Sequence, residues 1–212
     1  EKPVWKENPI NQIMEYGESL IYDLNATDLS GIYSWWVNYT LYFTINKDGV
    51  ITNTLSIPVG EYWLEVRAYD PYSNFCNATI KITVEDTISP TWDQVPINQV
   101  IEYGTTLSYD LNASDLSGIL SYWINNTSNF NMSADGLLTN ITALIAGTYW
   151  IEVRAYDPYD NFCTKIIKII VEEPKHPEKT SSPVIPGYDI FLIFYTILMV
   201  FLLVLKRYRR KK

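Results

Sequence analysis

Histidine and cysteine are scarce in this sequence of 212 residues, which contains one histidine, His176, and two cysteines, Cys76 and Cys163. His176 lies in a stretch rich in proline and lysine, which excludes a histidine-dependent triad from the rest of the chain. Neither a zinc-ligand spacing nor a glycine-rich phosphate-binding loop is present. We therefore expect the protein not to be an enzyme.

Positive charge is also scarce outside the C-terminal end. The formal net charge is -8, but residues before Tyr188 contain 10 Lys and Arg against 23 Asp and Glu, which gives about -13. Such a surface repels nucleic acids and anionic lipids, so no nucleic-acid partner is expected. An acidic surface does suit divalent cations.

Before residue 187 no stretch has apolar residues that recur with the helical period of about 3.6 residues. Apolar residues instead recur at every second position. In "EYWLEVRAYD" the side chains of Leu64, Val66 and Ala68 alternate with those of Trp63, Glu65, Arg67 and Tyr69. This pattern is typical of a strand with one face in a core and one face in water. "FTINKDGVITN" indicates a hairpin that turns at Asp-Gly. The sequence therefore predicts an all-β ectodomain.

The sequence contains one long internal repeat. Residues 3–87 align with 90–174 without a gap, and about 48 of the 85 pairs are identical. A unit of about 87 residues approaches the length of a small β-sandwich, roughly 100 residues. We predict two tandem sandwiches, residues 1–88 and 89–174.

Several motifs in each copy resemble the cadherin-like repeat family. "YFTINKDGVITN", "GEYWLEVRAYD" and "ATIKITVED" resemble its later strands, and the likeness covers about half of each copy. The resemblance implies an Ig-like Greek-key sandwich and a role in adhesion at the cell surface.

The C-terminal part differs in composition from the repeats. Residues 175–187 are rich in proline and serine and predict a linker. Residues 188–205 form an apolar run that we predict to be a single transmembrane α-helix, and six of the seven residues 206–212 are basic. By the positive-inside rule this tail is cytoplasmic and the N-terminal ectodomain lies outside a cell membrane.

The order of spacer, apolar run and basic end also resembles the anchoring tails of archaeal surface proteins. The resemblance implies that such a tail can be cleaved and replaced by a lipid, but retention of the helix is our expectation. No signal peptide is visible, so we expect a mature form or the end of a longer precursor.

Eight asparagines lie in N-x-[ST] sequences, more than the two or three expected by chance. Their side chains are candidate glycosylation sites in a surface protein. They are Asn25, Asn38, Asn77, Asn112, Asn125, Asn126, Asn131 and Asn140. The alternative is that Asn and Thr are simply common in the turns of this chain.

The two cysteines occupy equivalent positions of the two copies. Two equivalent points of separate sandwiches lie too far apart for a disulfide. We expect Cys76 and Cys163 to be small buried residues, with an intermolecular bridge as the alternative.

Asp70 and Asp157 occupy the position of an acidic residue that binds calcium in cadherin repeats. The resemblance implies calcium at the junction of the domains, with Glu15, Glu85, Asp86 and Glu102 as candidate companions. Against calcium, the junction "VEDTISPTW" lacks the family's full linker motif. We therefore expect no cofactor, with calcium as the alternative. The alternative is that Asp70 and Asp157 only initiate turns.

An outward ladder of aromatic and charged side chains recurs in both copies. It comprises Trp63, Arg67 and Tyr69 in the first copy and Trp150, Arg154 and Tyr156 in the second. This face could bind glycans or other surface proteins. Alternatively, arginine covers an aromatic ring and the ladder stabilises the sheet.

The sequence thus predicts a single-pass cell-surface protein that acts as a stalk, spacer or adhesion module. A calcium-dependent adhesion receptor and a membrane-tethered carbohydrate-binding module are the alternatives.

Overall fold

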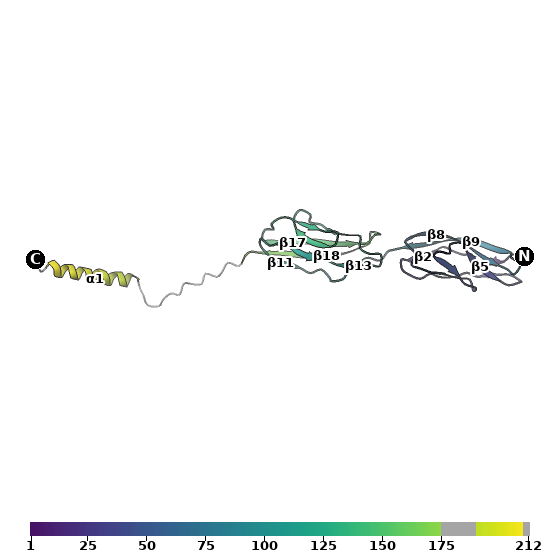
Figure 1. The fold of residues 1–212 in the computed structure, drawn as a ribbon, viewed down its shortest axis with the longest axis horizontal. Coiled ribbons are helices and arrows are strands. Elements are labelled where there is room, and N and C mark those ends of the chain that lie inside the picture. Colours follow the sequence, from purple (N-terminus) through teal and green to yellow (C-terminus); the bar gives the residue numbers. More distant parts are fainter. Residues whose placement is uncertain (175–189, 210–212) are drawn as a thin grey trace. The chain divides into compact units, whose positions relative to one another are not determined.

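The computed structural model describes residues 1–174 and 190–209. The chain divides into two compact units, Glu1–Glu173 and Pro174–Lys212. Figure 1 shows the ribbon of both units.

The first unit consists of strands alone, and the two sequence repeats contribute nine strands each. The first repeat contains β1 Val4–Trp5, β2 Gln12–Glu15, β3 Ile21–Asp23, β4 Ala26–Thr27, β5 Ser34–Val37, β6 Phe43–Ile45, β7 Val50–Asn53, β8 Gly60–Tyr69 and β9 Phe75–Glu85. The second contains β10 Thr91–Trp92, β11 Gln99–Glu102, β12 Ser108–Asp110, β13 Ala113–Ser114, β14 Ser121–Ile124, β15 Phe130–Met132, β16 Leu137–Asn140, β17 Gly147–Tyr156 and β18 Phe162–Glu172. The prediction that both repeats are all-β is confirmed.

Both repeats pair their strands in the same order. In the first, a four-stranded sheet has the order β2-β9-β8-β5, a three-stranded sheet has the order β3-β7-β6, and β1 pairs with β4. Strand β2 runs parallel to β9, and the other pairs are antiparallel. The second repeat has the orders β11-β18-β17-β14 and β12-β16-β15, with β10 beside β13.

Each repeat has its own hydrophobic core, formed by both of its larger sheets. Phe43, Leu64 and Ile80 lie in the first core, and their counterparts Phe130, Ile151 and Ile167 lie in the second. The alternation predicted for "EYWLEVRAYD" is confirmed in β8, and β17 repeats it. Burying each such side chain contributes about 1.5–3 kcal/mol, so each sandwich has its own source of stability.

Glycine is required at the tip of the predicted hairpin, which the structure forms from β6 and β7. Gly49 has φ +89°, and a Cβ there would lie 2.5 Å from the carbonyl oxygen of Leu24. Gly136 repeats this arrangement against the carbonyl oxygen of Leu111. The turn can therefore approach the backbone between β3 and β4, or between β12 and β13, only without a side chain.

The second unit contains one helix, α1, which spans Ile190–Arg209. The predicted linker 175–187 and residues 210–212 of the basic tail lie outside the described residues. In the described parts of the chain, no helix has both the length and the apolar character needed to cross a membrane.

Candidate metal site at the junction of the two sandwiches

The junction begins with Asp86, the first residue after β9. Its side chain is 9% exposed. Oδ1 accepts a hydrogen bond from the backbone N–H of Ile88 at 3.2 Å. Oδ2 is buried and has no hydrogen-bond partner among the described residues. A buried carboxylate oxygen without a partner is costly, so a ligand at this position would stabilise the fold.

Two carboxylates of the second sandwich lie beside Asp86. Asp157 follows β17 and is fully buried. Asp115 follows β13, and its Oδ1 accepts hydrogen bonds from the backbone N–H and the hydroxyl of Ser117 at 2.8 and 2.7 Å. One carboxylate oxygen each from Asp86, Asp115 and Asp157 lies within 4.8 Å of the other two.

Neighbouring contacts hold the sandwiches together around these carboxylates. The side-chain Nδ2 of Asn161 donates to the backbone oxygen of Asp86 at 2.9 Å and to Oδ2 of Asp157 at 2.8 Å. Leu116 lies directly against Gly17, where a Cβ would collide with Cδ2 of the leucine. Asn161 therefore links the end of one sandwich to the start of the next.

The donor set fits a hard divalent cation. Calcium binds oxygen ligands at 2.3–2.6 Å, so two of its ligand oxygens can be up to about 5 Å apart. The spacing of at most 4.8 Å lies within this range. Three close carboxylates repel one another strongly without a cation, and the cluster offers no nitrogen or sulfur ligand that would favour zinc. The three carboxylates thus fit calcium.

The structure brings together only some of the residues predicted to bind calcium. Asp86 and Asp157 lie in the cluster, while Asp70, Glu15, Glu85 and Glu102 lie outside it. Glu15 instead accepts hydrogen bonds from the N–H and hydroxyl of Thr87.

Asp70 is the counterpart of Asp157 in the first sandwich, and its carboxylate holds a turn. It accepts hydrogen bonds from the backbone N–H of Tyr72 at 2.8 Å, and from the backbone N–H and Nδ2 of Asn74 at 2.9 and 2.8 Å. Burial raises the pKa of Asp70, but these hydrogen bonds outweigh it and the pKa lies below its ordinary value. This matches the alternative that the aspartate initiates a turn.

Asp115 was missing from the residues predicted to bind metal. It belongs to "DLSGI", which recurs as residues 28–32 and 115–119. The recurrence marks the motif as part of the fold. Its position beside Asp86 depends on how the two sandwiches join, which the repeat pattern does not reveal.

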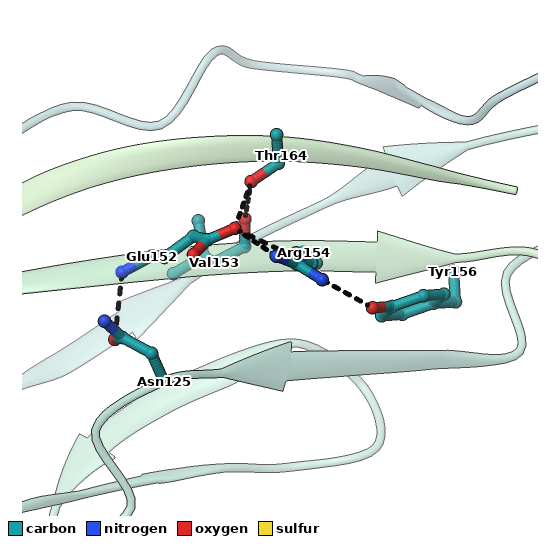
Figure 2. Close-up of polar contacts among 6 residues, drawn as sticks. All are labelled: Asn125, Glu152, Val153, Arg154, Tyr156 and Thr164. Atoms are coloured by element: carbon teal, nitrogen blue, oxygen red, sulfur yellow. Dashed lines mark hydrogen bonds and ion pairs between the residues drawn. The ribbon is translucent and has the colours of Figure 1, made fainter.

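The arginine of the predicted outward ladder is part of a closed network. Figure 2 shows Arg154 between Glu152 and Tyr156 on β17. Its Nε donates to Glu152 at 2.7 Å, and a second guanidinium nitrogen donates to the Tyr156 hydroxyl at 3.2 Å. The guanidinium carbon also lies 4.8 Å from the ring centres of both Trp123 and Phe162. These hydrogen bonds hold the pKa of Arg154 above its ordinary value.

The first sandwich contains the same network around Arg67. Its guanidinium carbon lies 4.6 Å from the ring centre of Trp36 and 4.9 Å from that of Phe75. Glu65 and Tyr69 accept its hydrogen bonds at 2.9 and 3.3 Å. Both arginines thus connect neighbouring strands of a sheet. This agrees with the alternative interpretation, in which arginine covers an aromatic ring and the ladder stabilises the sheet.

The ladder tryptophans point outward, and each lies near a lysine. Trp63 and Trp150 are both 58% exposed. The Lys81 ammonium lies 5.9 Å from the ring centre of Trp63, and the Lys168 ammonium lies 4.4 Å from that of Trp150. Each tryptophan ring therefore makes a cation–π contact with a lysine ammonium.

The eight candidate glycosylation sites differ in accessibility. Six asparagines are exposed, whereas Asn126 and Asn140 are half-buried. Oδ1 of Asn140 accepts from the N–H of Leu107 at 2.6 Å, and its Nδ2 donates to the carbonyl of Thr142 at 2.8 Å. Because a glycan would be attached at this nitrogen, Asn140 is better suited to holding the strand than to modification.

Both cysteines are free thiols. Cys76 is buried and Cys163 is half-buried. Burial raises the pKa of each thiol, which keeps it protonated and unreactive.

Comparisons with known proteins support the fold. No family model matches the chain, and no curated protein matches it. The structure of titin domains Z1Z2 in complex with telethonin matches 82% of this chain and 98% of that chain, with 13% identity and a TM-score of 0.51.

Cadherin structures also match. Mouse cadherin-23 EC22-24 shares 18% identity over 82% of this chain and 65% of that chain, with a TM-score of 0.40. Human protocadherin-24 EC1-2 shares 17% identity over 81% of this chain and 99% of that chain, with a TM-score of 0.39. At such identities the titin match establishes the fold alone, which is two tandem Ig-like β-sandwiches.

Proposed function

We propose that this chain is a cell-surface spacer or adhesion module whose two sandwiches are held in a fixed orientation by a calcium ion. The observation that carries the proposal is the buried, unpartnered Oδ2 of Asp86 beside the carboxylates of Asp115 and Asp157. This oxygen would become a ligand of calcium, and the positive charge of the ion would offset the repulsion among the three carboxylates.

The chemistry of the site suits a mechanical role. Asp86 follows the last strand of the first sandwich, and Asp115 and Asp157 belong to the second. A cation bound to all three joins both sandwiches, whereas its removal leaves like charges that push them apart. The junction would therefore be stiff with calcium and loose without it.

Attachment to a membrane is part of the proposal. In α1 the described side chains from Tyr195 to Val204 that are large and apolar are each at least 46% exposed. Basic residues follow the apolar run. Such a helix gains stability when its apolar surface is covered by lipid.

The attachment is tested by extracting host membranes with alkaline carbonate. The full chain should remain with the membranes, while a chain that ends at residue 187 should be released. Release of the full chain would contradict membrane anchoring.

To test the calcium site, the melting temperature of the full chain in detergent is measured twice. One sample contains millimolar calcium and the other contains excess chelator. An ion present at a hundredfold excess over its Kd stabilises the folded state by about 2.7 kcal/mol. The melt of the second sandwich should therefore rise by several degrees with calcium.

Asp115→Asn and Asp28→Asn form a matched pair of variants. Asp28 accepts the same hydrogen bonds from Ser30 that Asp115 accepts from Ser117, but it lies outside the cluster. Asp115→Asn should abolish the calcium effect and Asp28→Asn should retain it. An unchanged calcium effect in Asp115→Asn would refute the site.

A carbohydrate-binding module has weaker support. Trp63 and Trp150 are exposed enough to stack on a sugar. However, a lysine lies over each ring and the neighbouring arginines use their donors within the sheet.

A further inference from the structure

A surface hollow lies at the same place in both sandwiches. In the second sandwich its volume is about 360 Å³, and its walls include Asp93, Val95, Ile97, Tyr109, Asp110 and Asn112. In the first its volume is about 160 Å³, and its walls include Asn8, Ile10, Tyr22, Asp23 and Asn25. Cavities that bind small ligands have volumes of about 300–1,000 Å³, so the larger of these two hollows reaches that size and the smaller does not.

Two hydrogen bonds hold the walls of the larger hollow together. The N–H of Asp93 donates to the carbonyl of Asn112 at 2.9 Å, and the N–H of Ile97 donates to the Tyr109 hydroxyl at 2.9 Å. The first sandwich makes both bonds at the equivalent positions. The hollow is therefore a fixed part of the fold.

A candidate glycosylation site lies on the rim of each hollow. Asn25 and Asn112 are both exposed, and N-A-T in the first repeat becomes N-A-S in the second. Between the repeats, the third position thus changes in a way that preserves the site. The other recurrent pair, Asn38 and Asn125, instead uses its side-chain oxygens to bind the backbone of a neighbouring strand.

The amide of Asn112 is oriented by one hydrogen bond. Its Nδ2 donates to Oδ2 of Asp110 at 3.3 Å, and Asp110 also lines the hollow. Glycosylation joins Nδ2 to C1 of a sugar, breaks the bond between C1 and a phosphate oxygen of a lipid-linked sugar donor, and releases one amide proton with the lipid phosphate. The second N–H remains, so the bond to Asp110 survives the modification. Asn112 is exposed, so a sugar has better access to this nitrogen than to that of the half-buried Asn140.

The walls of the larger hollow match the surface of a sugar ring. Val95 and Ile97 are 61% and 66% exposed, and together with the half-buried Tyr109 they provide apolar walls. The carboxylates of Asp93 and Asp110 are acceptors for hydroxyl groups. A sugar ring has an apolar face of C–H groups and a rim of hydroxyls, so it fits both kinds of wall.

We propose that the hollow beside Asn112 binds the first sugar of a glycan attached to that asparagine. Attachment gives the sugar an effective concentration on the order of millimolar, so weak contacts are enough to hold it. The bound sugar covers Val95 and Ile97. The smaller hollow has the polar Asn8 in place of Val95 and leaves the glycan on Asn25 free.

The inference rests on the proposed location at the cell surface, since glycans of this kind are added to exported proteins. It requires neither calcium nor the membrane anchor. The outcome of its test is therefore independent of the tests of those two features.

Release of glycans from the folded chain tests the proposal. The full chain is made in a host that N-glycosylates exported proteins and is treated with an amidase that cleaves the bond between Nδ2 and the sugar. Mass spectrometry of the peptides follows each site. The glycan on Asn112 should be released at least about tenfold more slowly than that on Asn25, because the amidase acts only while the sugar is out of the hollow. After unfolding, both should be released at the same rate.

Asp93→Lys with Val95→Asn gives the larger hollow the residues of the first repeat. This variant should release the glycan on Asn112 as fast as that on Asn25. Ile145→Thr is the matched control, because Ile145 is 72% exposed and lies outside the hollow, and it should leave the slow release unchanged. Both variants should keep their melting temperatures.

Three results would overturn the proposal. The first is an Asn112 that carries no glycan, and the second is equal release from Asn112 and Asn25 in the folded chain. The third is slow release that persists in the variant with Asp93→Lys and Val95→Asn, since something other than the hollow would then protect the sugar.

Discussion

At the scale of single residues, the aspartates that follow strands accept hydrogen bonds from turns, and one of them has a carboxylate oxygen without a hydrogen-bond partner. Asp70 and Asp157 each accept three hydrogen bonds from the turn that follows. Asp86 accepts one bond on Oδ1 and buries Oδ2 without a partner. The turn contacts explain why aspartate recurs in both repeats, but only Asp86 calls for a ligand.

Asparagine side chains give the sharpest test at this scale. Asn140→Ala should lower the free energy of unfolding by about 1–3 kcal/mol, because the N–H of the buried Leu107 loses its acceptor. Asn131→Ala, on an exposed site of β15, should change it by less than about 0.5 kcal/mol. Chemical denaturation measures both, and equal effects would contradict the assigned role of Asn140.

At the scale of elements, the predicted alternation and the predicted hairpin of β6 and β7 were confirmed because they depend on local patterns. Strand β8 buries Leu64, Val66 and Ala68 completely, as a period of two requires. The partners of Arg67 could not be predicted in the same way. Trp36 and Phe75 reach it from β5 and β9, so their contact depends on the register between strands.

The hairpin of β6 and β7 provides a matched pair of glycine substitutions. Gly49 and Gly31 have φ +89° and +85°, but a Cβ would collide with neighbouring atoms only at Gly49. Gly31→Ala should cost about 1–2 kcal/mol of stability through backbone strain alone.

Gly49→Ala should cost more than Gly31→Ala, because the carbonyl oxygen of Leu24 and the ring of Trp35 must also move. Urea denaturation of the two variants separates the strain from the collision. Equal losses would contradict the close approach at the hairpin tip.

At the scale of the whole molecule, the repeat predicted two sandwiches, and the strand orders and separate cores agree with that prediction. The exact metal cluster could not be predicted, because it arises only where one sandwich meets the next. Asp115 lies 29 positions after Asp86 and 42 before Asp157. Only the fold brings these residues together.

Independent cores lead to a prediction for the two sandwiches. Phe43→Ala should destabilise the first sandwich by about 3–5 kcal/mol, since its ring is completely buried. The second sandwich has its own core and should retain its stability. Hydrogen exchange resolved by repeat measures this, and an equal loss of protection in both repeats would contradict the separation of the cores.

The central claim is that calcium binds between the sandwiches, and calcium titration followed by amide NMR signals of the full chain in detergent tests it most directly. Signals around Asp86, Asp115 and Asp157 should shift together and saturate at one ion per chain. Those around Asp28 and Asp70, where no third carboxylate completes a cluster among the described residues, should stay in place. Absent shifts at the junction, or equal shifts at both sets of aspartates, would contradict the account.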